Sequence, residues 1–214
     1  MPSIRSLILA ISLLLALVAA GAQAELKEGH DFAAIAPQPT EAKGKIEVTE
    51  FFWYGCPHCY DFEPVLNQWL KTLPKDVAFH RIPAIFPNGR WTPGAKLFYA
   101  LQAIGEENRL HGELFDAIHI QSIDYANEAE VTDWLETKGV DRQKFSAAYH
   151  STAVQSKIKR AQTLTQAHAI RAVPAVVVGG KYLTTNTMVG SHEAVPAAID
   201  QLIAKVRAEQ GRKQ

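Results

Sequence analysis

Cysteine is nearly absent from this sequence, with two residues in a chain of 214. Both lie in one short segment, at Cys56 and Cys59. A single pair so close together cannot join remote parts of the chain, which excludes a disulfide framework. A structural zinc site built on paired cysteines is also disfavoured, because such sites need four ligands and one C-x-x-C motif supplies two.

An excess of either charge is lacking as well. Lys and Arg total 22, and Asp and Glu total 22. A nucleic-acid surface requires a clustered basic excess, so we expect no nucleic-acid partner. Internal repeats and low-complexity segments are absent, while 47% of the residues are hydrophobic. That content is enough for the core of one domain, with or without a large insertion.

The apolar run near the start of the chain is too short for a membrane span. It extends from Leu7 to Ala20, about 14 residues, whereas a transmembrane helix needs ~20. Arg5 precedes it and the small-residue pattern Ala22-Gln23-Ala24 follows it, which is typical of a secretory signal peptide. We therefore expect a signal peptide over residues 1–24, cleaved after Ala24, in preference to a membrane anchor. Export would place the chain where disulfides persist.

The cysteine pair stands between an apolar run that ends at Gly55 and a helical pattern that begins at Pro57. A three-residue offset at a helix start lets both sulfurs meet in one disulfide. A structural staple is one alternative, but closing so short a loop stabilises a fold by only about 2 kcal/mol. A metal site is another alternative. A C-x-x-C motif between a strand and a helix is typical of thioredoxin-like redox chemistry, which we favour.

Cys56 has two features that lower the pKa of a thiol. A helix N-terminus favours the thiolate, and so does a nearby cation, which His58 can provide. Pro57 suits the first helical turn, where its missing N–H costs nothing. A stabilised thiolate makes the reduced protein more stable and its disulfide more oxidising. The motif therefore favours oxidation of a substrate, while a reductant stays an alternative.

The hydrophobic pattern predicts a β-α-β unit, a helical insertion and a closing hairpin. Pro64 should kink the helix that follows the cysteines. A segment at 25–39 is predicted as an extended lead-in or an edge strand. The expected strands are 45–54, 77–82, 173–178 and 181–184, with a two-residue turn at Gly179-Gly180. The expected helices are 57–73, 91–105, 106–120, 128–138, 142–150, 152–169 and a last one capped by Ser191.

The segment Cys56-Pro57-His58-Cys59 resembles the DsbA family of periplasmic thiol oxidases. Glu50-Phe51-Phe52 before it, Tyr60-Asp61-Phe62-Glu63 after it and Arg171-Ala172-Val173-Pro174-Ala175 further on share the resemblance. It implies an α/β fold, namely a thioredoxin fold with a large all-helical domain inserted after the second core strand. We assign 25–90 and 151–214 to the thioredoxin-like domain and 91–150 to the inserted helical domain.

The resemblance also implies a function. A periplasmic monomer would donate its Cys56–Cys59 disulfide to reduced, unfolded, newly exported proteins. A DsbB-like, quinone-linked inner-membrane oxidase would then reoxidise it. The disulfide itself would be the redox group, with no other cofactor and no metal. Two alternatives stay open: a disulfide reductase or isomerase on the same fold, and a peptide-binding chaperone whose disulfide is incidental.

Site residues follow from the same resemblance. Cys56 would be the exposed, attacked sulfur and Cys59 the shielded, resolving one. Glu50 would be a buried acid that exchanges a proton with Cys59. The Val173-Pro174 bond is expected to be cis and to face the cysteines, leaving the backbone of Val173 free to pair with an extended substrate.

Several neighbouring residues allow two interpretations. Glu63 and Arg81 match further charged positions of the family, but ordinary surface charge explains them at least as well. Trp53, Tyr54 and Phe86 fit a substrate groove or core packing equally well.

Overall fold

The structure is a computed structural model that describes residues 25–87 and 89–211, so the expected signal peptide lies outside the described residues. The strands are β1 (Ala33–Ala34), β2 (Ile46–Phe52), β3 (Val77–Pro83), β4 (Ala175–Val178) and β5 (Tyr182–Thr184). The helices are α2 (Pro57–Leu70), α3 (Thr92–Ile104), α4 (Glu107–His119), α5 (Glu128–Thr137), α6 (Arg142–Tyr149), α7 (Thr152–Ala167), α8 (Asn186–Val189) and α9 (Val195–Gly211). These elements confirm an α/β fold.

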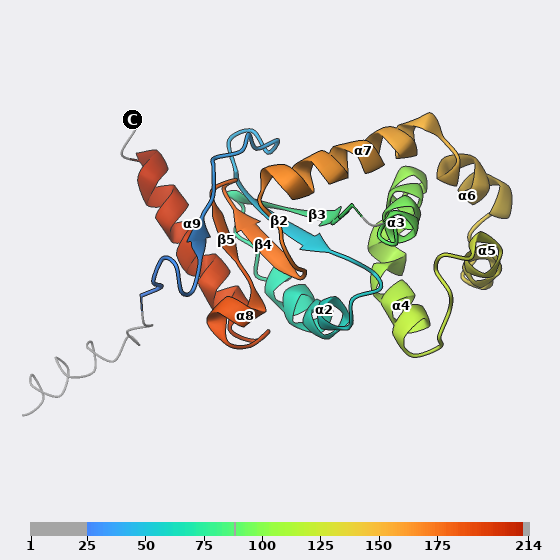
Figure 1. Cartoon of the computed structure of the whole chain (residues 1–214), viewed down its shortest axis with the longest axis horizontal. Helices are drawn as coiled ribbons and strands as arrows, with labels where there is room; N and C mark the ends of the chain where they lie inside the picture. Colours follow the sequence, from blue (N-terminus) through green and yellow to red (C-terminus); the bar gives the residue numbers. More distant parts are fainter. Residues whose placement is uncertain (1–24, 88, 212–214) are drawn as a thin grey trace, which may run out of the picture.

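The strands form one sheet in the order β1-β5-β4-β2-β3 (Figure 1). Strand β2 is central, parallel to β3 and antiparallel to β4. Nearly all of its residues are buried, as expected for a strand covered on both faces. The register sets Glu50 opposite Arg81 on β3 and opposite Val176 on β4. The central strand therefore carries an acid into the middle of the sheet and delivers the chain to the cysteines.

Helix α2 begins directly after the first cysteine. Cys56 is its N-cap residue with extended backbone angles, and Pro57 opens the first turn. The helix continues through Pro64 and ends at Leu70, three residues before the predicted end, because Lys71 and Thr72 form a closing turn. The predicted kink at Pro64 stays a prediction. The helix packs Phe62, Leu66 and Trp69 toward the sheet and α9.

The chain leaves the sheet after β3 and comes back to it at β4, with helices α3 to α7 in between (Figure 1). This confirms the helical insertion after the second core strand. The insertion shares one apolar core with the thiol region, since Phe98, Leu114 and Phe115 cluster with Phe52 and Cys59. The exact division at residues 90 and 150 stays a prediction.

Two details of the C-terminal part differ from the sequence prediction. Val178 pairs with Tyr182, so Lys181 belongs to the bend and not to the strand. Gly179 and Gly180 both have positive φ, and the Lys181 N–H donates to the Val178 carbonyl across them. Ser191 does not cap the last helix. It closes a turn that ends at Ala194, one residue before α9 starts.

Candidate active site

The two cysteines are free thiols at the start of α2. Cys59 is 1% exposed and Cys56 is 8% exposed. The expectation of an exposed Cys56 was therefore wrong, because neighbouring segments cover most of its sulfur. The order is nevertheless as predicted, with Cys56 the more accessible of the two.

The Val173-Pro174 peptide bond is cis, as predicted. The Cys56 Sγ donates to the Val173 carbonyl oxygen at 3.5 Å, across 117 positions of sequence. Val173 is half-buried. The structure thus brings this segment and the cysteine motif together, as the resemblance implied.

The pKa values of the two thiols move in opposite directions. The pKa of Cys56 is lowered to about 6, chiefly by a hydrogen bond from the Cys59 thiol, against the opposing effect of burial. The backbone N–H groups of Cys59 and His58 lower it further. Burial raises the pKa of Cys59 well above its usual range, and donation of its proton to Cys56 raises it more. Near neutral pH this pair holds one thiolate and one thiol.

His58 and Pro57 are exposed at the first turn of α2. The charge of His58 lowers the pKa of Cys56, but it is the smallest of the contributions named above. A ring that faces solvent is screened by water, which explains why its effect is small. The His58 ring lies 6.0 Å from the His192 ring, between their centroids. The backbone N–H of His58 thus lowers the pKa of Cys56 more than its side chain does, whereas the sequence analysis had considered only the side chain.

The three aromatic residues considered for a substrate groove have separate locations. Tyr54 is fully buried in the core. Trp53 and Phe86 are half-buried and pack on the two sides of Trp91, with ring centroids 4.3 and 4.7 Å from it. A Cβ on Gly55 would lie 2.5 Å from the Trp53 ring and from the Tyr125 hydroxyl, so glycine is needed there. Because Tyr54 is fully buried, core packing and not a substrate groove explains its position.

Glu50 is buried in β2 and is 1% exposed. Its Oε2 accepts a hydrogen bond from Arg81 Nε at 3.1 Å. Burial raises the pKa of Glu50 to about 8, with the charge of Arg81 opposing the rise and that of Glu63 adding to it. The negative form of Glu50 in turn raises the pKa of Cys59. The acid and the second thiol are thus coupled electrostatically, and the proton exchange between them that the resemblance implied stays a prediction.

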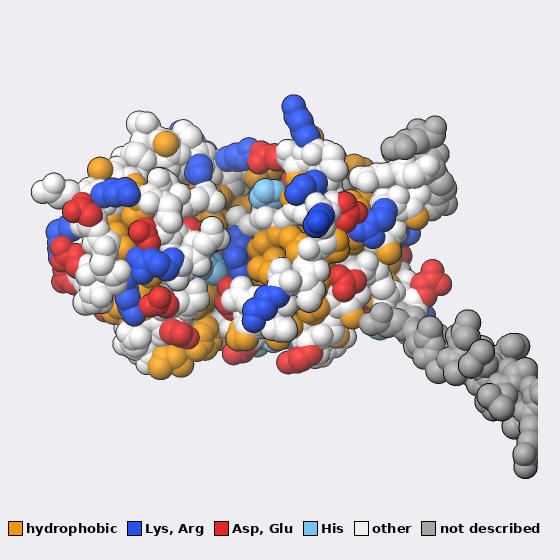
Figure 2. All heavy atoms as spheres, turned by 180° about the vertical axis from the view of Figure 1, so that it is seen from behind, with side chains coloured by type: hydrophobic (Ala, Val, Ile, Leu, Met, Phe, Trp, Pro, Cys, Tyr) orange, Lys and Arg blue, Asp and Glu red, His pale blue; other side chains and the backbone are white. Residues whose placement is uncertain are grey.

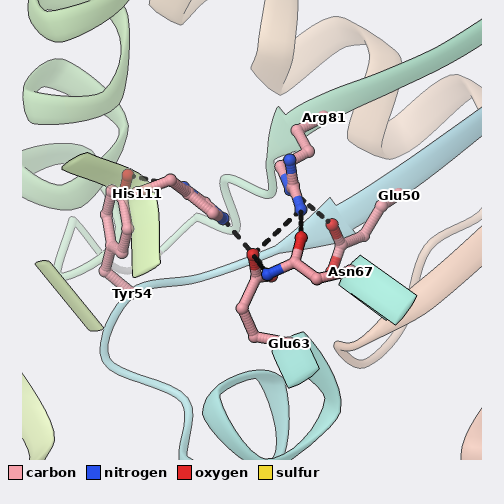
Figure 3. A network of polar contacts seen from close by, with 6 residues as sticks. All are labelled: Glu50, Tyr54, Glu63, Asn67, Arg81 and His111. Carbon is pink, nitrogen blue, oxygen red and sulfur yellow. Dashed lines mark hydrogen bonds and ion pairs between the residues drawn. The ribbon is translucent and has the colours of Figure 1, made fainter. Parts of the chain in front are cut away.

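Glu63 and Arg81 are not ordinary surface charges. Their side chains are 7% and 10% exposed, and Arg81 Nη2 donates to Glu63 Oε1 at 2.9 Å. Asn67 supports both, accepting from Arg81 Nη2 at 3.2 Å and donating to Glu63 Oε1 at 2.9 Å. Arg81 therefore links an acid of β2 to an acid of α2 (Figure 3). The register of the two parallel strands, with Glu50 opposite Arg81, would have indicated this pairing.

Asn67 and His111, which the sequence analysis did not single out, complete this cluster. His111 on α4 is buried, and its Nε2 lies 3.5 Å from Glu63 Oε2. Its Nδ1 lies 2.8 Å from the Tyr54 hydroxyl (Figure 3). No local pattern in the sequence pairs a histidine of the insertion with an acid of α2. The contact depends on how the two parts of the chain pack.

Other kinds of site have no support in the part of the chain that the structure describes. No cluster of three or more His, Cys, Asp or Glu side chains there could hold a metal ion. None of its helices has the length and apolar character needed to cross a membrane. Figure 2 shows the molecule from the side opposite to that of Figure 1. On this face Lys and Arg side chains are interspersed with Asp and Glu side chains, which fits the balanced charge of the sequence.

Comparison with known proteins identifies the family. The family model for the DSBA-like thioredoxin domain matches residues 47–195, which include the cysteine motif and Val173-Pro174. The chain belongs to the DsbA family. This assignment makes it a thiol:disulfide oxidoreductase whose redox group is the Cys56–Cys59 pair itself.

Individual DsbA proteins are similar over most of the chain. The thiol:disulfide interchange protein DsbA of Pseudomonas aeruginosa is 40% identical over 207 residues, covering 95% of this chain and 98% of its own length. That of Azotobacter vinelandii is 40% identical over 188 residues, covering 87% of each chain. The crystal structure of Pseudomonas aeruginosa DsbA matches with a TM-score of 0.83 and 39% identity, covering 87% of this chain and 97% of that one.

Proposed function

We propose that this protein is a periplasmic oxidase of thiol pairs in newly exported proteins, acting through a mixed disulfide at Cys56. The opposite pKa shifts of the two thiols carry the proposal. A disulfide whose reduced form contains a stabilised thiolate is a strong oxidant, and DsbA is itself the standard example of this principle. The names of the relatives, thiol:disulfide interchange proteins, support the same reaction.

The reaction begins with the Cys56–Cys59 disulfide. A substrate thiolate attacks Cys56 Sγ, a mixed disulfide forms, and the bond to Cys59 breaks with Cys59 leaving as a thiolate. Because the pKa of Cys59 is high, it takes up a proton at once. A second substrate thiolate then attacks the substrate sulfur of the mixed disulfide, and Cys56 leaves as a thiolate. Two electrons pass to the enzyme, so the substrate is oxidised and the enzyme reduced.

Glu50 is the proposed partner of Cys59 in this proton exchange. It is buried, and its raised pKa of about 8 means that it holds a proton near neutral pH. Giving that proton to the Cys59 thiolate would leave a carboxylate beside Arg81 Nε, which stabilises it. Pro174 and the backbone of Val173, next to Cys56 Sγ, are proposed to hold the substrate segment in an extended form.

Turnover requires an external oxidant. We place that role with a DsbB-like, quinone-linked inner-membrane oxidase, which takes the electrons from the Cys56–Cys59 dithiol and restores the disulfide. The protein itself acts as a monomer after removal of its signal peptide.

The test is oxidation of a reduced, unfolded protein by the purified disulfide form. We expect rapid and stoichiometric loss of substrate thiols. Cys56→Ser should abolish the reaction, whereas Cys59→Ser, reacted with a substrate disulfide, should accumulate a mixed disulfide at Cys56 that is visible on a non-reducing gel. Reshuffling of wrong disulfides with no net oxidation would favour an isomerase, and full function of Cys56→Ser in cells would favour a chaperone.

A further inference from the structure

The buried cluster around Arg81 is held at its far end by a residue of the helical insertion. Arg81 Nε donates a hydrogen bond to Glu50, and Arg81 Nη2 donates one to Glu63. The two acids therefore bind different nitrogens of one guanidinium. The Oε1 atom of Glu63 is held by Arg81 and Asn67. The Oε2 atom of Glu63 faces His111 Nε2 at 3.5 Å. Among the described residues, neither of these last two atoms has a conventional hydrogen-bond partner.

The bonds of His111 fix its tautomer. Burial opposes the ionisation of Glu63, but the nearby His111 ring, the charge of Arg81 and a hydrogen bond from Asn67 outweigh it and lower the pKa of Glu63. An ionised carboxylate only accepts, so His111 Nε2 carries the hydrogen and Nδ1 accepts from the Tyr54 hydroxyl. Burial lowers the pKa of His111, so the ring is neutral at pH 7. His111 thus offers Glu63 a fixed, uncharged donor.

The charges facing His111 come from every neighbouring element. They are Glu63 on α2, Arg81 on β3, Glu107 on α4 itself and Glu50 beyond Arg81, with the Tyr54 hydroxyl on the Nδ1 side. Arg81 is the one permanent cation of this set, against three carboxyl groups. One guanidinium cannot fully neutralise Glu50 and Glu63 when both are ionised. A group that stabilises the ionised form of Glu63 therefore favours the protonated form of Glu50.

We propose that His111 is a positioning residue for the thiol chemistry: with Tyr54 it holds the Glu63 carboxylate on Arg81, and it thereby governs proton exchange between Glu50 and Cys59. This inference rests on the proposed function, to which it adds a role for the helical insertion, since His111 lies on α4. Glu63 and Asn67 also line a cleft of about 510 Å³ between α2 and α4, which gives the cluster a route to solvent.

Loss of the ring has a defined consequence. Without His111, Glu63 loses a donor to its ionised form, and the pKa of Glu63 rises. Arg81 then pairs more completely with Glu50, whose pKa falls. Loss of the His111 N–H, which faces the Glu63 carboxylate at 3.5 Å in a buried site, is expected to move the titration midpoint by about one pH unit, or tenfold in the ionised fraction. Because ionised Glu50 raises the pKa of Cys59, the effect reaches the thiol.

The experiment is an NMR titration of the Glu50 side-chain carboxyl in the dithiol protein. His111→Phe should lower the midpoint by about one pH unit, and the break in the pH dependence of the equilibrium with glutathione should move equally. His111→Gln keeps a donor toward Glu63 and should stay close to the wild type. His168→Gln is the matched control, because His168 is also buried but bonds the Leu164 carbonyl on α7.

An unchanged Glu50 midpoint in His111→Phe would overturn the inference, and so would equal shifts in the Phe and Gln variants. A merely structural role would lower the stability of the fold and leave the midpoint in place. Should His111→Phe not fold, His111→Asn, whose amide is too short to reach Glu63, replaces it with the same expected shift. The titration needs no substrate, so failure of the wild type to oxidise an unfolded protein would contradict the proposed function separately.

Discussion

The surroundings of Cys56 and Cys59 differ far more than their three-residue separation suggests. Cys56 sits at the N-cap of α2, where the Cys59 thiol and the backbone N–H groups of Cys59 and His58 lower the pKa of its thiol. Cys59 lies one turn further in, among apolar side chains and on the side of the buried acid Glu50. One sulfur is therefore stabilised as a thiolate and the other as a thiol.

This difference shows that the cysteine motif alone does not determine the chemistry. Helix geometry supplies the donors to Cys56, whereas the sheet register and the packing of the insertion supply the charges near Cys59. A disulfide between such unequal sulfurs breaks in one direction, because Cys56 is the better leaving group. The environment of each thiol can be changed separately, which gives the following tests.

Removal of Arg81 should have the largest effect on the stability of the fold. It changes the surroundings of Cys59, because Arg81 pairs with the acid Glu50 that acts on this thiol. Arg81→Met leaves two buried acids without their shared partner, and breaking a buried ion pair costs roughly 3–5 kcal/mol. Denaturant unfolding at pH 7 measures the loss. Arg142→Met is the control, because that exposed arginine also pairs with two acids, Asp133 and Glu136. We expect little change there, and equal losses in both variants would refute the buried role of Arg81.

Glu50→Gln should change how stability depends on pH. The folded pKa of Glu50 is about 8 and its ordinary value is 4.5, so its proton stabilises the folded state in acid. That contribution is lost progressively as the pH rises from 4.5 to about 8, on the order of a few kcal/mol in all. Glutamine does not titrate, so the variant should gain stability relative to the wild type between pH 5 and pH 8. Parallel stability curves for the two proteins over that range would rule out this titration.

His58→Ala should have the smallest effect, on the Cys56 side. The imidazole is exposed and its charge is the least of the causes that lower the pKa of Cys56. The backbone N–H of residue 58 remains in the variant. We expect the pKa of Cys56 to rise by less than about one unit, as followed by thiolate absorbance. A larger rise would mean that the side chain, and not the helix terminus, dominates.

Much of this molecule could be predicted from its sequence. The strand before the motif, the helix start at Pro57 and the succession of helices after β3 all have strong periodic or turn signals. The cis bond at Val173-Pro174 and the burial of Glu50 were implied by the family resemblance, since nothing local distinguishes that proline from others in the chain. Local patterns thus gave the elements, and the resemblance gave their arrangement around the thiols.

The parts that escaped prediction depend on packing between remote segments. His111 is separated from Glu63 by 48 positions and lies in a different part of the fold, so no spacing rule connects them. Glu63 and Arg81 looked like surface charges because their burial depends on α4 and on the strand register. The burial of Cys56 likewise depends on remote segments, since it belongs to the core cluster shared with the insertion and its Sγ contacts the Val173 carbonyl oxygen.

A thiolate absorbance titration of the reduced protein tests the central claim most directly. The account predicts that one sulfur ionises with a midpoint near pH 6 and that the other stays protonated until well above pH 9. Cys59→Ala should leave the ionising sulfur in place, with a higher midpoint because Cys56 loses the hydrogen bond from the Cys59 thiol. Two sulfurs ionising together near pH 9 would contradict the account.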